Sequence, residues 1–256
     1  MSHELRTPLN AMIGYSDLLL AGIPEPIAPA VARKVERIGV SARHLLELID
    51  EILTFARLEA GEERAERSLT PLSSILHGVT ALIEPLAVNE GISYTCIAPA
   101  DDIVINSDPL KIRQILVNLL ANAVKFTNVG GVTLTVRREG SGLLFRVEDT
   151  GVGIPADQID RIFEPFYQAD HGTTRKAGGT GLGLTVTRRL ARLLGGDVKA
   201  QSEPSVGSVF TVWLPIGDGG DMGDMGDMGD GGDGGDGGDG GDGGDGGESG
   251  VLGDAE

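Results

Sequence analysis

The chain has 256 residues, of which 40% are hydrophobic and 23% charged, so it is long enough for one or two globular domains, which excludes a peptide or a disulfide-stapled miniprotein. Its net charge is −17, but the last forty residues hold thirteen carboxylates and no Lys or Arg, which leaves residues 1–216 at −4. That balance argues against a nucleic-acid partner, because phosphate binding needs a surplus of Lys and Arg on one face.

The composition also indicates a cellular compartment. The single cysteine, Cys96, cannot form an internal disulfide and is compatible with a reducing environment. No apolar run approaches the roughly 20 residues of a membrane helix, and residues 1–4 do not open a signal peptide. We therefore expect a soluble, cytoplasmic chain without a membrane segment, and membrane anchoring of a longer parent protein stays open.

Residues 3–60 predict two helices joined by a turn. Apolar residues of the first run recur at steps of three and four, and the segment 22–26, Gly-Ile-Pro-Glu-Pro, ends it. The second run keeps this spacing over more than three heptads, with Val31, Val35, Ile38, Ala42, Leu45, Ile49, Ile52 and Ala56. Two helices alone cannot bury this apolar stripe, so we predict a homodimer in which two hairpins form a four-helix bundle.

A charged stretch at 57–70, with the linker proper at 61–70, separates the hairpin domain, 1–60, from mixed elements. We predict helices at 71–89, 108–127 and 182–195, and strands at 92–97, 132–137, 143–148 and 208–214. Helices grouped beside a mostly antiparallel sheet make a layered α+β domain over residues 71–216, with one face of the sheet against the helices.

Residues 217–256 repeat Gly-Asp-Met and then Gly-Gly-Asp triplets. Half of the chain's forty glycines lie here beside few apolar residues, so the segment cannot offset the entropy cost of ordering its backbone. Calcium-binding β-rolls also combine Gly and Asp, but they need an apolar position in every repeat. We therefore expect a disordered acidic tail, and its origin in a nucleotide-repeat expansion stays open.

Two glycine-containing motifs suggest ligand chemistry. The segment 149–153, Asp-Thr-Gly-Val-Gly, follows a predicted strand, where a carboxylate can accept a hydrogen bond from an exocyclic amine and glycines admit a flat ligand. The segment 178–184, Gly-Gly-Thr-Gly-Leu-Gly-Leu, opens a helix whose free N–H groups suit a polyphosphate. Taken singly, each has an ordinary alternative: a tight turn for the first and a flexible hinge for the second.

The predicted helix 108–127 carries the third motif. Asn118 and Asn122 are four residues apart, so both amides lie on one helix face. An amide offers an uncharged oxygen to Mg²⁺, and Lys125 can balance phosphate charge. For two helical asparagines alone, the alternative is a solvated face.

These motifs together resemble those of a histidine-kinase catalytic domain. The asparagine helix, the segments 149–153 and 179–183, and the segment 163–167, Phe-Glu-Pro-Phe-Tyr, occur in that family's order and spacing. Residues 3–9, His-Glu-Leu-Arg-Thr-Pro-Leu, resemble the family's phosphoacceptor box. The resemblance covers residues 2 to about 216 and implies a sensor histidine kinase of two-component systems, with the ATP-binding sandwich shared by type II topoisomerases and Hsp90-type chaperones.

The resemblance implies a role for each matching residue of the catalytic domain. Asp149 would bind the adenine amine, with Gly151 and Gly153 giving it room. Residues 168–180 would form a mobile lid over ATP. Asn122 would coordinate Mg²⁺, with Asn118 in or beside that shell, and Lys125 would contact phosphate. Phe163 and Phe166 would pack at the hinge of the lid. Gly179, Gly181 and Gly183 would control its closure and contact the phosphates, with Thr180 and Leu182 also among the nucleotide-binding residues.

In the phosphoacceptor box, the resemblance makes His3 the nucleophile. An unperturbed imidazole, with a pKa of about 6.5, keeps a neutral nitrogen available at cytoplasmic pH. Glu4 would orient the ring and accept its other proton, and Thr7, one helical turn further on, would hold a water for dephosphorylating a partner. Without its neighbours, His3 would be an ordinary polar residue at a ragged terminus.

Family members usually continue the first helix for several turns before the phosphoacceptor, whereas His3 is here the third residue. Because an opening turn frays, we expect ATP binding to survive better than autophosphorylation, and we expect a fragment of a larger sensor or an incompletely predicted gene product. We expect the chain to phosphorylate His3 from Mg-ATP and to pass the phosphoryl group to the receiver domain of a response regulator. The alternatives are a phosphatase-biased kinase and a nucleotide-binding dimerisation module without transfer activity.

Overall fold

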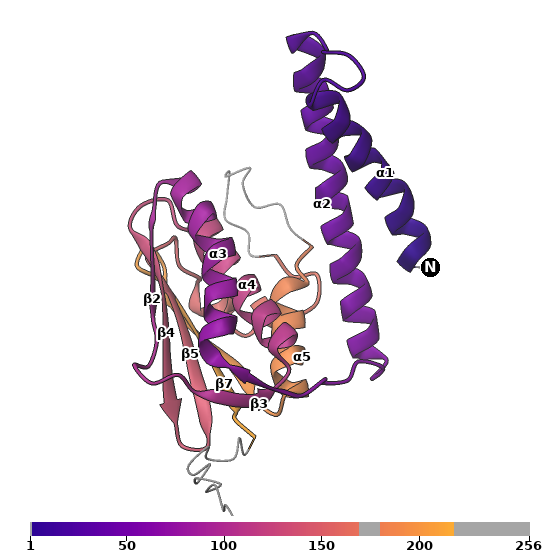
Figure 1. Ribbon diagram of the computed structural model, residues 1–256. Coiled ribbons are helices and arrows are strands. Elements are labelled where there is room, and N and C mark those ends of the chain that lie inside the picture. The colour runs from indigo at the N-terminus through magenta and orange to yellow at the C-terminus, as the bar shows by residue number, and fades with distance from the viewer. Residues whose placement is uncertain (1, 169–179, 218–256) are drawn as a thin grey trace, which may run out of the picture. The chain divides into compact units, whose positions relative to one another are not determined.

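A computed structural model describes residues 2–168 and 180–217, with side chains from Glu4 onward. These residues all fall within one compact unit, Met1–Gly219. Its first part is the helical hairpin predicted from the sequence, formed by α1 (Ser2–Leu20) and α2 (Pro29–Glu59) (Figure 1). The helix α2 continues past Arg57, so the first residues of the charged stretch are helical. The expected tail lies outside the described residues from Asp218 onward.

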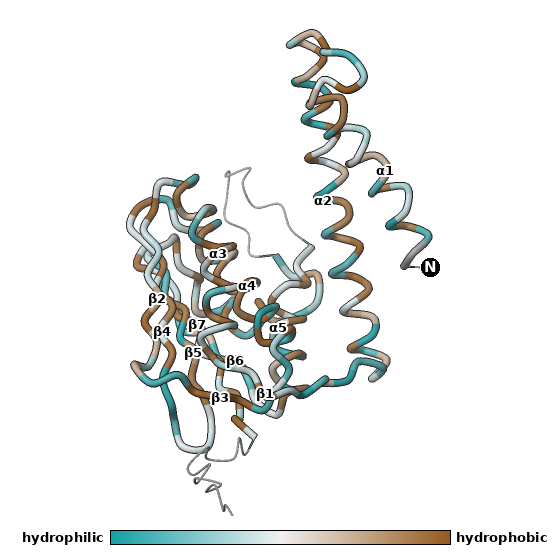
Figure 2. Tube along the Cα trace, in the orientation of Figure 1, coloured by the Kyte–Doolittle hydropathy of each residue, from teal (hydrophilic) through white to brown (hydrophobic). Residues whose placement is uncertain are grey.

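The contact between α1 and α2 buries only part of the apolar stripe. Leu9 and Ser16 of α1 and Val35 and Ala42 of α2 are at most 8% exposed. Four other positions of the same stripe, spaced seven residues apart, stay open, since 47–55% of the surface is exposed at Val31, Ile38, Leu45 and Ile52. Figure 2 shows apolar residues recurring along the length of α2. The hairpin therefore has more apolar surface than its own two helices can cover.

The following residues form an α+β domain. Its five-stranded sheet has the order β2-β4-β5-β7-β6, in which β2 pairs parallel with β4 and the other three pairs are antiparallel. The strands are β2 (Ser93–Ile97), β4 (Gly131–Glu139), β5 (Gly142–Asp149), β6 (Asp197–Glu203) and β7 (Gly207–Pro215). A separate antiparallel pair consists of β1 (Ser68–Pro71) and β3 (Val104–Ser107).

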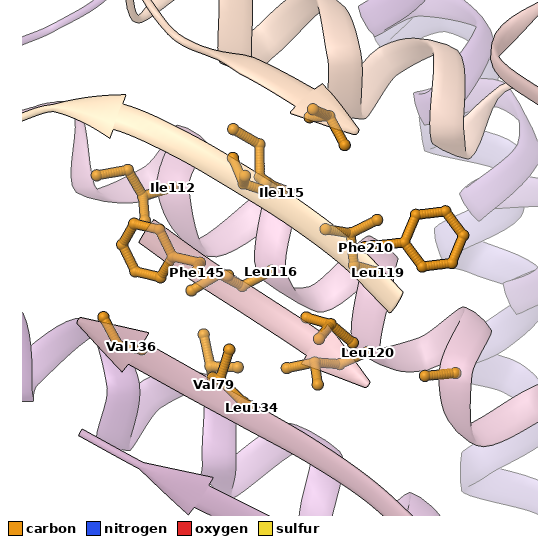
Figure 3. Close-up of a cluster of buried hydrophobic side chains, with 14 of the residues drawn as sticks. Val79, Ile112, Ile115, Leu116, Leu119, Leu120, Leu134, Val136, Phe145 and Phe210 are labelled. Atoms are coloured by element: carbon orange, nitrogen blue, oxygen red, sulfur yellow. The ribbon is translucent and has the colours of Figure 1, made fainter. Parts of the chain in front are cut away.

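Three helices cover one face of this sheet: α3 (Leu72–Glu90), α4 (Pro109–Phe126) and α5 (Gly183–Leu193) (Figure 1). Strand residues alternate, so that Phe210, Val212 and Leu214 of β7 are buried while their neighbours are partly exposed. The core between helices and sheet centres on α4, whose inner side chains meet those of β4, β5 and β7 (Figure 3). The predicted α+β class, with a hairpin followed by an α/β sandwich, is confirmed.

Three strands were not expected from the sequence: β1, β3 and β6. The first two have four residues each, and β6 reads Asp-Val-Lys-Ala-Gln-Ser-Glu, with a single β-branched residue. Each of them is defined by pairing with a partner strand, β6 along β7 and β1 along β3. Local sequence carries little of that information, because strand formation depends strongly on neighbours.

Among the described residues, α3 is the one helix that is long and apolar enough, by length and composition, to cross a membrane. Six of its residues are buried in the core of the α+β domain: Leu72, Ile75, Leu76, Val79, Ile83 and Ala87. Packing inside the domain accounts for the apolar residues on this face of α3.

The start of α4 is held by an ion cluster around the buried Asp108. Asp108 caps the helix, since its Oδ1 accepts hydrogen bonds from the N–H groups of Leu110 and Lys111, both at 3.1 Å. Its Oδ2 accepts from the N–H of Glu66 at 2.9 Å and lies 3.0 Å from the Lys111 ammonium, which also pairs with Glu63 at 3.0 Å. The linker before β1 is thereby fastened to the helix that carries the asparagine motif.

Replacing Asp108 with Ala is expected to lower the free energy of unfolding by about 2–4 kcal/mol, through loss of the cap and of the bond to Glu66. Burial acts to raise the pKa of Asp108, but the hydrogen bonds and the Lys111 charge outweigh it and hold that pKa below its ordinary value. The free energy of unfolding that Asp108 adds relative to Ala should therefore be fully present above about pH 4, the ordinary pKa of Asp. It should be lost as the pH falls through the lower pKa that Asp108 has in the folded state.

Urea unfolding of Asp108→Ala at pH 7 and pH 3 measures this effect. The exposed Asp101, changed to Asn, is the control and should unfold like the wild type at both pH values. An equal loss of stability in the two variants would contradict the assignment.

Candidate nucleotide site

A cleft with about 1030 Å³ of empty space, part of it open to solvent, lies where β5 ends and α5 begins. It brings together residues that are far apart in the sequence. The members of the predicted site that line it are Asn122, Lys125, Asp149, Gly153, Thr180, Gly181 and Gly183. The three polar motifs therefore meet around one space.

Asp149 is a fixed acceptor at the wall of this cleft. It is 6% exposed, and its Oδ1 accepts hydrogen bonds from the backbone N–H groups of Gly151 at 2.9 Å and Ser208 at 3.2 Å. Burial raises the pKa of Asp149, while these hydrogen bonds oppose the rise. Ser208 was missed by the sequence analysis, because only the pairing of β5 with β7 sets it opposite Asp149.

Gly151 and Gly153 were expected to make room for a ligand, and the structure adds a reason within the protein. A Cβ on Gly151 would lie 2.5 Å from the carbonyl oxygen of Phe126. Gly153 has a φ of 70°, and a Cβ there would lie 2.0 Å from the carbonyl oxygen of Glu203. Gly153 lines the cleft, whereas Gly151 does not. Backbone packing alone therefore requires glycine at both positions.

The two asparagines of α4 have different surroundings. Asn122 lines the cleft together with Lys125. Asn118 does not line it, and its Nδ2 lies 3.4 Å from the Gly183 carbonyl oxygen and 3.5 Å from Thr187 Oγ1. Burial lowers the pKa of Lys125, and the nearby charge of Glu51 acts against that change. Asn118 thus links α4 to the start of α5, while Asn122 and Lys125 face the space itself.

The start of α5 forms another wall of the cleft. Leu182 is fully buried, and its N–H donates to Thr180 Oγ1 at 3.1 Å. Gly183 and Leu184, the first residues of the helix, line the cleft, so the positive end of the helix dipole is close to it. Of the expected lid, residues 169–179, and with them Gly179, lie outside the described residues.

The segment 163–167 packs against the residues around the start of α5. Its two phenylalanines, Phe163 and Phe166, do not line the cleft. The carbonyl oxygen of Phe163 accepts a hydrogen bond from Thr185 Oγ1 at 3.0 Å. The N–H of Phe166 donates to the carbonyl oxygen of Gly181 at 3.1 Å. The second contact joins two residues that flank the expected lid, and the hinge role of Phe163 and Phe166 stays a prediction.

Gly181→Ala is expected to reduce the free energy of unfolding by about 1–2 kcal/mol, the cost of a left-handed backbone for a residue with a Cβ. Gly181 has a φ of 72°, and a Cβ would lie 2.8 Å from backbone atoms of Phe166 and Tyr167. Gly183 is the matched control, because nothing lies within 4 Å of a Cβ built there. Denaturant midpoints of the two Ala variants measure the difference, and equal midpoints would contradict it.

Other residues of the cleft gave no signal in the sequence. Its apolar walls include Ile154, Ile162, Leu184 and Phe210. Such residues are indistinguishable from ordinary core residues in a sequence. Glu51 also lines the cleft, although it belongs to α2 of the hairpin, where charged residues are expected on the solvated face.

The phosphoacceptor box lies at the beginning of α1. The backbone of His3 is helical, and Glu4 and Thr7 are exposed. Arg6 pairs with Asp50 of α2, with its Nε donating to Oδ1 at 2.8 Å. The box is thus anchored to α2 one turn after His3.

Comparisons with known proteins agree with this arrangement. The family model described as "His Kinase A (phospho-acceptor) domain" matches residues 1–61, and the model described as "Histidine kinase-, DNA gyrase B-, and HSP90-like ATPase" matches residues 107–218. The chain is 40% identical over 218 residues to the sensor histidine kinase RcsC of Escherichia coli strain K12, a match that covers 84% of this chain and 23% of the relative.

Two further matches give the same result. The signal transduction histidine-protein kinase BarA of the same strain is 39% identical over 217 residues, with 82% of this chain and 23% of BarA covered. The crystal structure of full-length ShkA in complex with AMPPNP has a TM-score of 0.72 and 36% identity, and it covers 84% of this chain and 44% of ShkA. The chain therefore spans less than a quarter of the length of the curated relatives RcsC and BarA.

Proposed function

Because this chain belongs to the sensor histidine kinases of two-component systems, we propose that it transfers the γ-phosphoryl group of ATP to His3 and then to the receiver domain of a response regulator. The observation that carries the proposal is that Asn122, Asp149 and Gly181 line one cleft. The Asp149 carboxylate suits the amine of a purine, and the Asn122 amide suits Mg²⁺. The helix start beside Gly181 suits phosphates.

The adenine base would lie at Asp149. With Oδ1 engaged by two backbone N–H groups, Oδ2 would accept a hydrogen bond from the exocyclic amine. The apolar walls at Ile154, Ile162 and Phe210 would cover the flat ring. Guanine would present a carbonyl oxygen to the same carboxylate, so the site favours adenine.

The phosphates would lie between α4 and the start of α5. Lys125 would balance their charge, and the N–H groups at Gly183 and Leu184 would donate to their oxygens. The donor set fits Mg²⁺, since Asn122 offers an amide oxygen and Mg²⁺ is commonly bound through few protein ligands together with substrate phosphates. When bound, Mg²⁺ supplies charge neutralisation at the phosphates. Asn118 would not touch the nucleotide, and would act by holding the start of α5 against α4.

The transfer itself would use residues of α1. The neutral ring nitrogen of His3 attacks the γ-phosphorus, an N–P bond forms, and the bond to the bridging oxygen of ADP breaks. Glu4 accepts the proton from the other ring nitrogen. The phosphoryl group then passes to an aspartate of the receiver domain, which regenerates the imidazole. Thr7, four residues after His3, would hold the water when the kinase dephosphorylates its partner.

A second copy of the chain would cover the open apolar stripe of the hairpin. Besides the heptad positions of α2, α1 exposes Leu5, Met12 and Leu19 at 36–51%, with the same spacing of seven residues. A shallow groove lined by Leu9, Met12, Ile38 and Leu45 lies between the two helices. Apolar residues repeated every seven positions on both helices are typical of the interior of a four-helix bundle.

Incubation of the chain with ATP labelled at the γ-phosphate and Mg²⁺ tests the proposal. We expect label on the protein that is released by acid, as a phosphohistidine requires, and that moves to a receiver domain added afterwards. Nucleotide binding without any label would instead favour a dimerisation module that binds nucleotide and transfers nothing.

A further inference from the structure

One charged wall of the cleft comes from outside the ATP-binding domain. The helix α2 runs beside α5 (Figure 1), and its half-buried Glu51 lines the cleft. The carboxylate of Glu51 accepts a hydrogen bond from Oγ1 of Thr180, three residues before the first residue of α5. A carboxylate therefore lies at the end of the cleft where phosphates would bind.

The partners of Glu51 are groups suited to an anion. Lys125 lines the same cleft, and the charge of Glu51 is near enough to act on it. Thr180 supplies a hydroxyl, and the helix start behind it supplies a positive dipole end. A carboxylate and a phosphate oxygen compete for such donors, because both are anionic acceptors, and they repel each other at short range.

Three further contacts hold α2 in this place. The ring of Phe55, one turn after Glu51, meets the ring of Phe166 edge to face with centroids 6.1 Å apart. The guanidinium of Arg189 lies 4.8 Å from the centre of the Phe55 ring and also pairs with Glu59. The contact thus extends along two turns of α2 and fixes the direction of Glu51.

We propose that Glu51 is a built-in competitor of the ATP phosphates, so that nucleotide must displace the part of α2 around Glu51 before it is fully bound. This rests on the proposed function, since it assumes that the cleft holds phosphates. Asp50, the residue before Glu51, pairs with Arg6 of the phosphoacceptor box. Two consecutive carboxylates of α2 therefore connect the nucleotide cleft to the helix that bears His3, and ATP loading loosens α2 where the box is anchored.

The test compares Glu51→Gln and Glu51→Ala with the wild type, using the full 256-residue chain. Calorimetric titration with Mg-ATP should show about fivefold tighter binding in both variants, because the competing charge is gone. Adenosine, which lacks phosphates, should bind as it does to the wild type. Glu47→Gln is the matched control, since Glu47 lies one turn before Glu51, is exposed and pairs only loosely with His44 at 3.8 Å.

Four results would overturn the proposal. Unchanged Mg-ATP affinity would show that Glu51 does not compete, and weaker affinity would make it part of the nucleotide or Mg²⁺ site. An equal gain for adenosine would show that the side chain blocks space and does not act through its charge. Failure of the wild type and of all variants to bind Mg-ATP would contradict the proposed function itself, and this inference with it.

Discussion

Changing Asp149 to Asn is expected to abolish detectable ATP binding, a loss of about 100-fold or more in affinity. The amide oxygen can still accept from the N–H groups of Gly151 and Ser208, so the local fold should survive. The other end of the side chain becomes an NH₂ donor, which would face the amine of adenine. Two buried N–H donors that face each other form no hydrogen bond, so the amide of the variant and the adenine amine would both be unsatisfied.

Titration calorimetry with ATP and a thermal unfolding curve measure this prediction. Asp157→Asn is the control, because Asp157 is exposed on the short helix η1 (Ala156–Gln158) and does not line the cleft. The control should bind ATP like the wild type. If Asp149→Asn did the same while remaining folded, the adenine assignment would be wrong.

Changing His3 to Gln is expected to remove the acid-labile label completely while ATP binding stays within about twofold of the wild type. Glutamine has no nucleophilic nitrogen, so phosphoryl transfer loses its acceptor. Residue 3 lies at the beginning of α1, whereas the cleft is lined by α4, α5, β5 and the middle of α2, so nucleotide binding does not require it.

Label incorporation and ATP titration on the same samples separate the two effects. His44→Gln is the matched control, because His44 lies on α2, is exposed and, among the described residues, pairs with Glu47 at 3.8 Å. It should be labelled like the wild type. Label that persists in His3→Gln would mean that another residue is the acceptor.

Much of this architecture is predictable from the sequence, for physical reasons that particular elements show. The helices α3, α4 and α5 begin and end within two residues of their predicted bounds, because each has a long apolar repeat and a break at its ends. In α4, Asp108 and Pro109 mark the start in the usual order of cap and first residue. Three of the four predicted strands are rich in β-branched or aromatic residues, the fourth, 143–148, is mostly apolar, and β6 lacks either signal.

Some residues of the candidate site are predictable from the sequence and others are not. Asp149, Asn122 and Gly181 are predictable because their motifs occur together in the order and spacing of the histidine-kinase family, although each motif alone has an ordinary alternative. Ser208 requires the register between β5 and β7, and Glu51 requires the packing of α2 against α5. The positions of Ser208 and Glu51 in the cleft do not depend on local sequence, so only the folded structure reveals them. The same holds for the apolar walls, since Ile162 or Phe210 has no feature that separates a ligand contact from a core position.

The crystal structure of this chain with Mg²⁺ and a non-hydrolysable ATP analogue tests the central claim most directly. We predict that the adenine amine lies within hydrogen-bonding distance of Asp149, and that the phosphates lie between Asn122, Lys125 and the start of α5 at Gly183. A nucleotide bound elsewhere, or with its base turned away from Asp149, would contradict this account.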